Sequence, residues 1–325
     1  MAYPRIVAAL AAALSLTGAA QAQDYPNRQI TMVVPFSAGG PTDTVARLVA
    51  EKMSSDLGQQ IVVENVGGAG GTLGAGQAAQ AAPDGYTILV HHIGMSTAPS
   101  LYANLPYDPV ESFEPIGLVT NAPMTIIGRK DMAEGTLQEL VTAIKADPQA
   151  YTLANAGVGA ASHLCSMLFM SAIDTEMTTV PYQGNGPIMT DILGGHVDLT
   201  CDQTTNTTQP ILDGQVKAYA VTTPGRIGQL PDVSTATEAG LDDFVITVWH
   251  GVYAPKGIEP NVRDALVSAL QKGLTHEKLV QRFTDLGTAP VTQADATPEA
   301  LETQLTSQIE FWRPFIERAG LAAGQ

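Results

Sequence analysis

The sequence is poor in basic side chains and in aromatic ones. Its 325 residues include 16 Lys and Arg against 32 Asp and Glu, which gives a formal net charge of -16. Nucleic acids and anionic membranes attract proteins through basic surfaces, so this excess of acid argues against both as partners. The aromatic share of 6% does not discriminate between classes of small ligand. Nor does the overall charge fix the sign of a ligand, because a pocket makes its own local field.

Long apolar runs are missing after the first residues. Beyond residue 22 no segment approaches the roughly 20 apolar residues that a spanning helix needs, so direct membrane insertion is not expected. The first 22 residues predict a signal peptide, 1–22, cleaved after Ala22. They contain one positive charge in residues 1–5, an Ala- and Leu-rich run over 6–20, and the small-x-small sequence Ala20-Gln21-Ala22. A membrane anchor is the alternative, but the run is too short to span and no cysteine at the cut could carry a lipid.

Cysteine is scarce, with only Cys165 and Cys201 in the chain. An exported chain meets an oxidising compartment, so a disulfide between the two is the first expectation and two separate buried thiols are the alternative. Neither a CxxC nor an HxxxH spacing occurs, which argues against a Cys/His metal site. No metal and no cofactor is expected.

The motifs of several enzyme classes are also absent. The sequence contains no G-K-[ST] for a P-loop and no G-x-S-x-G nucleophile elbow. "GAGQAA" at Gly74 fits a dinucleotide pattern but lies well beyond its strand, and Ser162 and His163, as neighbours on a helix, point apart. His91, His196, His250 and His276 are scattered along the sequence, and structural or surface roles are expected for them. The chain is therefore not expected to be an enzyme, and a secreted hydrolase is a remote alternative.

Hydrophobic periodicity shows what is present: strands that alternate with helices. Strand patterns occur at 30–34, 61–63, 86–90, 124–127, 151–153, 197–200, 216–221 and 245–253, and helical patterns at 44–53, 77–82, 137–146, 187–193, 261–274, 277–286 and 298–319. This alternation predicts an α/β fold with two lobes, each a mostly parallel sheet flanked by helices. With crossings near 121–124 and 247–250, lobe one comprises 23–123 plus 248–325, and lobe two comprises 124–247.

Two glycine-rich loops stand at predicted strand-to-helix junctions, one in each lobe. They are "FSAGGPTD" from Phe36 and "AGVGAASH" from Ala156. A helix start offers unpaired N–H groups and the positive end of the helix dipole, and small residues let a ligand approach the backbone. Such loops can bind an anion without Lys or Arg. An ordinary tight turn is the alternative for each loop alone, but the pair favours a clamshell that closes on a small acid.

The order and spacing of several segments carry a resemblance to a known family. These segments are "ITMVVPFSAGGPTD", "VENVGGAGGTLGA", "DGYTIL", "FEPIGLV", "SHL", "VPYQG" and W-x-G-V-Y-A-P. Over 25–325, and most specifically over 30–76, the chain resembles a Bug-type (TctC-like) extracytoplasmic solute receptor of the tripartite tricarboxylate transporter family. The resemblance implies a monomeric periplasmic binding protein of venus-flytrap fold. It further implies that the protein captures a small carboxylate and delivers it to a membrane permease. A sensor partner that hands its liganded form to a signalling receptor is the alternative.

The resemblance also implies which residues bind the ligand. In lobe one these are Phe36, Ser37, Ala38 and Gly39, then Gly71 and Thr72, and, after the third strand, the specificity residues His92, Gly94, Met95 and Ser96. In lobe two they are Ala160, Ala161, Ser162, His163, Gln183, Gly184, Asp202 and Gln203. Asp43 is expected as a structural, helix-start capping residue that rigidifies the first loop.

Asp202 bears on the kind of acid that binds. A carboxylate beside an anion site repels the ligand unless the ligand also carries a cation or the carboxylate points away. "SHLC" with "CDQTTNT" resembles the amino-acid-binding branch of the family, so an acidic amino acid or a dicarboxylate is expected, and a nicotinate-like acid stays open. The alternative for Asp202 is that it binds N–H groups in its own turn. A Cys165–Cys201 bridge would brace this half of the pocket.

Overall fold

The computed structural model describes residues 25–242 and 244–322, so the predicted signal peptide over 1–22 lies outside the described residues. The strands are β1 (Ile30–Val34), β2 (Ile61–Asn65), β3 (Thr87–His92), β4 (Phe113–Arg129), β5 (Thr152–Asn155), β6 (Thr178–Pro181), β7 (Leu199–Gln203), β8 (Val216–Val221) and β9 (Thr247–Pro255). The helices are α2 (Pro41–Leu57), α3 (Thr72–Ala79), α4 (Gly94–Leu101), α5 (Leu137–Ala146), α6 (Ala161–Ala172), α7 (Asn185–Gly194), α8 (Thr204–Leu212), α9 (Pro260–Leu274), α10 (Glu277–Asp285) and α11 (Pro298–Arg318). Short 3-10 turns cover Ala69–Gly71 and Pro148–Ala150.

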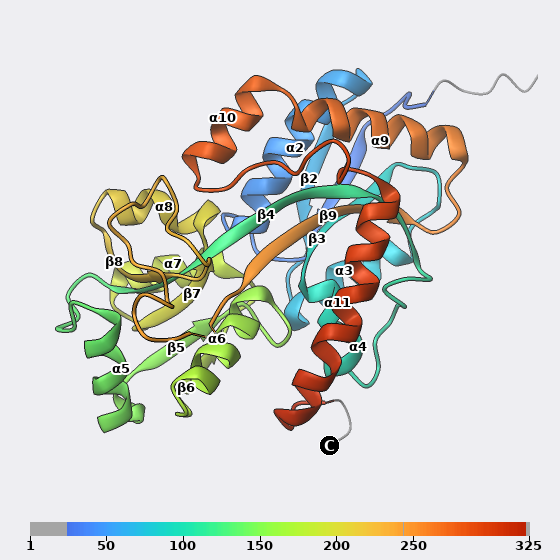
Figure 1. Ribbon diagram of the computed structural model, residues 1–325. Helices are drawn as coiled ribbons and strands as arrows, with labels where there is room; N and C mark the ends of the chain where they lie inside the picture. Colours follow the sequence, from blue (N-terminus) through green and yellow to red (C-terminus); the bar gives the residue numbers. More distant parts are fainter. Residues whose placement is uncertain (1–24, 243, 323–325) are drawn as a thin grey trace, which may run out of the picture.

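The long strand β4 joins two sheets. Its first part, from Phe113 to Pro123, pairs with β9, and from Met124 onward it pairs with β7 and β8 (Figure 1). One sheet has the order β2-β1-β3-β9-β4, and the other contains β4, β5, β6, β7 and β8. Since β9 runs antiparallel to both its neighbours and β4 runs antiparallel to β7 and β8, the other described strands of each sheet share one direction. The mostly parallel, two-lobed α/β fold that the sequence predicts is confirmed.

Helices cover both faces of the first sheet. The residues of β1 alternate between two cores: Met32 and Val34 pack in the core that includes α2 and α9, whereas Val33 packs in the core that includes α3 and α11. Figure 1 shows α2, α9 and α10 together on one side of β3 and β9, with α3, α4 and α11 on the other. A strand buried on both faces is apolar at nearly every position, which is why 30–34 is hydrophobic apart from Thr31.

Several elements differ in extent from the sequence prediction. β4 is much longer than the expected 124–127, because its prolines at 115 and 123 and two register shifts against β9 obscure the strand pattern. α2 starts at Pro41 rather than 44, since proline needs no N–H partner at the first helical position. The helix predicted at 77–82 lies earlier, at Thr72–Ala79, and α4 was not predicted because Gly94 and Pro99 weaken its pattern.

The expected disulfide is present in the second lobe. Cys165 of α6 and Cys201 of β7 are bonded, with their Cα atoms 6.0 Å apart. The bond ties a helix to the strand that it covers, and both residues are buried. Among the helices that the structure describes, none combines the length and the apolar composition that a membrane crossing requires.

Candidate functional site

A small cavity lies between the two lobes. Its volume is about 10 Å³, which is room for about one water molecule. Lobe one contributes Phe36, Gly40, Pro41, Thr42 and His92 to its wall, and lobe two contributes Ala161, Ser162, Asn185, Asp202 and Gln203. Because the cavity is this narrow, the lobes stand in a closed arrangement.

Four helices begin at this cavity. α2 starts after Gly40, α6 after Ala160, α7 after Gly184 and α8 after Gln203. In the described structure none of these four cap residues bonds a first-turn N–H with its side chain. The unsatisfied N–H groups and the helix dipoles therefore make the space between the lobes favourable for a negative group.

Three buried histidines cluster on the lobe-one side, and one of them, His92, lines the cavity. His92 stacks on Phe36 with ring centroids 4.5 Å apart, and its ring lies 5.1 Å from that of His91 and 5.9 Å from that of His250. Burial lowers the pKa of His91 to about 4 and that of His250 to about 3, and it holds the pKa of His92 well below its usual value. All three rings are neutral near pH 7. The residues that the structure describes include no cluster of His, Cys, Asp and Glu suited to a metal ion.

His91 and His250 are far apart in the sequence but lie close together in the fold, both buried. They meet because β3 pairs with β9, whose residues lie far along the chain, and His92 is the direct partner of His250 in that pairing. Nε2 of His250 lies 3.4 Å from Oγ1 of Thr42, a residue of the cavity wall. Its Nδ1 atom is buried and has no hydrogen-bond partner within the described part of the chain.

Asp202 stands at the end of β7 on the lobe-two side. Its carboxylate accepts hydrogen bonds from the N–H of Gln203 at 2.7 Å and from Nδ2 of Asn206 at 2.6 Å. Burial raises the pKa of Asp202 to about 7, although these two hydrogen bonds, and the nearby amide of Asn185, which forms no hydrogen bond of good geometry to it, partly offset the effect of burial. The carboxylate thus binds its own turn, as in the alternative drawn from the sequence, and it lines the cavity as well.

Unpaired polar atoms lie beside Asp202. Oγ of Ser162 accepts a hydrogen bond from the N–H of Ala156 at 2.8 Å and lies 3.4 Å from Oδ1 of Asn185. Nδ2 of Asn185 and Oε1 of Gln203 are buried and have no hydrogen-bond partner among residues 25–242 and 244–322. A buried donor and a buried acceptor without partners are costly unless a bound molecule satisfies them.

The structure brings six of the expected ligand residues to the cavity wall: Phe36, His92, Ala161, Ser162, Asp202 and Gln203. Four further residues that were not predicted also line it: Gly40, Pro41, Thr42 and Asn185. Each of these four lies at or next to a helix start that follows a glycine-rich loop. In "SAGGPT" the first three follow the predicted Gly39 by one to three residues, and in "YQGNG" Asn185 follows the predicted Gly184 directly.

Five further expected residues lie where the lobes touch, outside the cavity wall. The N–H of Ser37 donates to the carbonyl of Gln183 across the lobes at 3.0 Å. A Cβ atom on Gly184 would come within 2.7 Å of the Ser37 nitrogen. Ala38 and Gly39 line a wider groove of about 570 Å³ with residues of α7.

The remaining expected residues support the site or lie away from it. Ala160 is the buried N-cap of α6, and the N–H of Gly94 donates to Nδ1 of His92 at 2.9 Å. Gly71 packs against Phe36, since a Cβ there would lie 2.9 Å from its ring. Internal positions are occupied by Thr72, whose hydroxyl donates to Ala69, by Ser96, whose hydroxyl donates to Ile93, and by fully buried Met95. His163 lines a separate cavity of about 720 Å³ between α6 and the end of α11.

Asp43 holds the first loop. It is the third residue of α2, and its carboxylate accepts hydrogen bonds, each 2.9 Å long, from the N–H of Gly39, from Nε of Arg47 and from Nδ2 of Asn65. Burial alone would raise the pKa of Asp43, but these bonds outweigh it and lower the pKa. The N-cap itself is Gly40, so Asp43 fixes the loop from inside the first helical turn.

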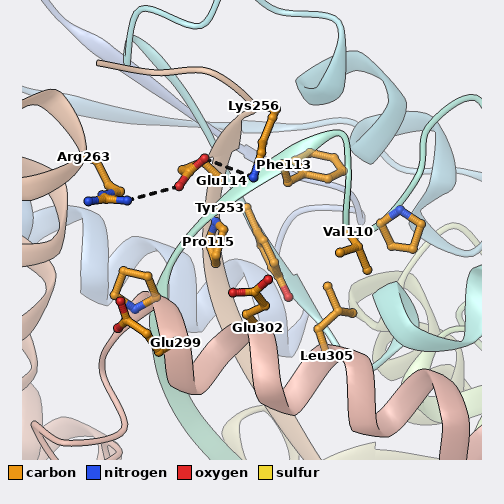
Figure 2. Close-up of a pocket in the computed structure, with 12 residues that line it drawn as sticks. Val110, Phe113, Glu114, Pro115, Tyr253, Lys256, Arg263, Glu299, Glu302 and Leu305 are labelled. Atoms are coloured by element: carbon orange, nitrogen blue, oxygen red, sulfur yellow. Dashed lines mark hydrogen bonds and ion pairs between the residues drawn. The ribbon is translucent and has the colours of Figure 1, made fainter. Parts of the chain in front are cut away.

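A second cavity, of about 100 Å³, lies within lobe one, where α11 approaches β4 and β9 (Figure 2). Glu114 on its wall pairs with Nζ of Lys256 at 3.3 Å and with Arg263 at 3.4 Å. The lysine and arginine of this wall thus share one carboxylate, and Glu299 and Glu302 add two further acids to the same wall. Its lining residues come from lobe one, so closure of the lobes does not form it, unlike the cavity at the four helix starts.

Comparisons with known proteins agree with this geometry. Residues 45–321 match the profile of the tripartite tricarboxylate transporter family receptor. A protein encoded in the TAR-I ttuE-ttuC' intergenic region of Agrobacterium vitis is 50% identical over 97% of this chain and 92% of its own length. The structure of the periplasmic binding protein BugD is 50% identical, with a TM-score of 0.90 over 92% of this chain and 100% of that one. The structure of MatC from Rhodopseudomonas palustris with bound malate is 37% identical, with a TM-score of 0.86 over 89% of this chain and 99% of that one.

Proposed function

This chain belongs to the tripartite tricarboxylate transporter receptor family, as a Bug-type member, and we propose that it captures a small carboxylate between its two lobes. The observation that carries the proposal is the meeting of four helix starts at one interlobe cavity. The described wall of that cavity contains neither Lys nor Arg, so backbone N–H groups supply the attraction for the carboxylate. Water-mediated contacts to such groups would accommodate related acids.

The second part of the proposal is the ligand class, which is an acidic amino acid or a dicarboxylate. The buried carboxylate of Asp202 supports an amino acid, since an ammonium group beside it would stabilise its charged form. The malate bound by MatC supports a C4 dicarboxylate. Protonated Asp202 would accommodate a dicarboxylate, because a neutral carboxyl group donates a hydrogen bond instead of repelling an anion.

The remaining parts of the proposal concern location and delivery. A periplasmic receptor whose signal peptide is cleaved after Ala22 would present its closed, liganded form to the permease of the transporter. The change of partners along β4 at Pro123 and Met124 supports a lobe division of 23–123 plus 248–325 and 124–247. Under this division the chain crosses from one lobe to the other within β4 and at the start of β9. These two segments would therefore carry the hinge motion.

The test is a thermal-shift and calorimetry screen of residues 23–325 against aspartate, glutamate, succinate, malate, citrate, nicotinate and terephthalate. Any acid that binds the folded state raises the melting temperature in proportion to ln(1 + [L]/Kd). Asp202→Asn should weaken aspartate or glutamate binding about tenfold or more and leave succinate and malate affinity unchanged or higher. Asp213→Asn is the matched control, because this acid lies at the other end of α8.

Three outcomes discriminate between the parts of the proposal. Stabilisation by acidic amino acids that Asp202→Asn removes would support the ammonium contact. Stabilisation only by acids without an amine would contradict that contact and leave the backbone anion site standing. No shift with any carboxylate would contradict the proposed function itself.

A further inference from the structure

We propose that the loop Gly157–Gly159 of lobe two is a latch that docks onto lobe one and determines how long the ligand is retained, with Tyr102 as its positioning residue. The inference rests on the proposed function, because it concerns the closure that captures the carboxylate. Tyr102 follows α4 in lobe one and lies outside the cavity wall. It would therefore act on the ligand only through closure.

The carbonyl oxygen of Val158 is the centre of the latch. It accepts a hydrogen bond from the hydroxyl of Tyr102 at 2.8 Å. It also occupies the space beside Gly70, where an added Cβ atom would lie 1.8 Å from the Val158 oxygen and 2.8 Å from the Tyr102 hydroxyl. Gly70 has a φ of 62°. The oxygen thus reaches Tyr102 only because position 70 has no side chain.

The next residue of the loop makes a second bond to lobe one. Oγ1 of Thr97 donates to the carbonyl of Gly159 at 3.1 Å, and a Cβ atom on Gly94 would lie 3.0 Å from the same oxygen. Gly157 and Gly159 have φ values of 102° and 81°, so the loop takes a shape that glycine adopts without strain. The two consecutive carbonyls at 158 and 159 therefore each meet a hydroxyl of lobe one.

A separate contact between the lobes uses the same chemistry. The N–H of Ser37 donates to the carbonyl of Gln183 at 3.0 Å, and a Cβ atom on Gly67 would lie 2.8 Å from that oxygen. At each contact a lobe-two carbonyl accepts a donor from lobe one, and a glycine of lobe one makes room for it. Opening the lobes breaks all three hydrogen bonds.

The latch loop also connects directly to the site. α6 begins right after it, so docking of Gly157–Gly159 places the start of α6, with Ala161 and Ser162, at the cavity. A ligand can leave only after this loop separates from lobe one. Bonds present only in the closed form slow opening, and hence ligand dissociation, without changing the contacts to the ligand.

The first test compares Tyr102→Phe with the wild type by stopped-flow dissociation of L-aspartate or L-malate. Loss of one neutral hydrogen bond from the closed form should raise the dissociation rate about fivefold and leave the association rate within about twofold. Tyr151→Phe is the control, because it removes a tyrosine hydroxyl that bonds Glu134 within lobe two. Dissociation of Tyr102→Phe at the wild-type rate would overturn the role of Tyr102.

The second test uses a pair of glycine variants. Gly70→Ala should abolish closure and weaken ligand binding about 100-fold or more, because its Cβ would occupy the position of the Val158 oxygen. Gly58→Ala is the matched control: Gly58 has nearly the same φ, 66°, but an added Cβ meets no atom within 4 Å. With saturating ligand, small-angle X-ray scattering should show a compact particle for the wild type and Gly58→Ala and a more extended one for Gly70→Ala. Compaction and tight binding of Gly70→Ala would overturn the latch.

A ligand-free measurement separates failure of the latch from failure of the proposed function. Hydrogen exchange of the Ser37 amide reports its bond across the lobes to Gln183. Without any ligand, Gly70→Ala should speed this exchange relative to both the wild type and Gly58→Ala. Equal exchange in the three proteins would overturn the latch, whereas absence of carboxylate binding to the wild type would contradict only the proposed function.

Discussion

His92 and His250 are direct neighbours across the pairing of β3 with β9, and neither ring can take up a proton without burying a charge. Burial lowers the pKa of His250 to about 3, whereas an exposed histidine in the unfolded chain titrates near 6.5. As the pH falls below 6.5, the unfolded state binds a proton at this histidine that the folded state does not bind. This histidine therefore makes the free energy of unfolding fall with acidification, between pH 6.5 and about 3.

The first prediction follows from this difference. Relative to the variant His250→Asn, the wild type should lose about 2 kcal/mol of stability between pH 7.5 and pH 5, because the asparagine does not titrate. Urea unfolding followed by circular dichroism at both pH values measures it. Parallel pH profiles of the two proteins would show that His250 does not resist protonation in the folded state.

Asp202 should give a pH dependence of the opposite sign. Burial raises its pKa to about 7, above the value near 3.9 in an unfolded chain, so the folded state holds a proton that the unfolded state has lost. Its contribution is present below pH 3.9 and is lost as the pH rises towards 7. Relative to Asp202→Asn, the free energy of unfolding of the ligand-free wild type should fall by about 2 kcal/mol between pH 5 and pH 7.5. The same unfolding experiment applies, and a wild type that gains stability against this variant as the pH rises would contradict the raised pKa.

Asn185 should be a ligand-binding residue that the sequence analysis did not include. Its buried Nδ2 atom has no partner within the described chain, and the residue lines the cavity beside Asp202. Asn185→Ala should therefore weaken binding of the best carboxylate about tenfold, the value of one hydrogen bond to a charged group. Met189→Ala, on the same helix but on the outer groove, is the control for isothermal titration calorimetry. Equal affinities of the two variants would remove Asn185 from the site.

The disulfide should stabilise the second lobe and its half of the site. Cys165 and Cys201 enclose a loop with a sequence separation of 36 residues, and cross-linking a loop of this size contributes about 4 kcal/mol in the chain-entropy model. The double variant Cys165→Ala, Cys201→Ala should therefore have a free energy of unfolding about 4 kcal/mol lower than the wild type. A reductant should destabilise the wild type and leave the double variant unchanged. Sensitivity of the double variant to the reductant would point to another cause.

Local patterns in the sequence were sufficient to predict the class of fold. Apolar runs such as 30–34, the glycine-rich loops and the amphipathic C-terminal helices are short-range signals, and each reappears close to its expected place. β4 was predicted poorly because its prolines and register shifts hide a strand that two sheets share. Element boundaries at proline and glycine were also misplaced, since packing can outweigh weak local propensities.

The candidate site was predicted in part. The loops at Phe36 and Ala156 revealed their helix starts, because small residues before an amphipathic pattern are a local feature of the chain. Met95 was expected at the ligand but lies fully buried, since the direction of a side chain after a strand depends on what packs around it. His163 was also expected at the ligand, but it lines a separate cavity that the end of α11 helps to form.

The sequence by itself determined the alternation of strands and helices, the acidic balance and the small residues that leave helix N–H groups accessible, because these depend on neighbouring residues. Only the tertiary structure decided that His91, His92 and His250 form one cluster, that Asp202 is buried at the cavity, and that Val158 reaches Gly70 and Tyr102. These relationships join residues far apart in the chain. Strand pairing and lobe closure create them, and both depend on packing in three dimensions rather than on local preference.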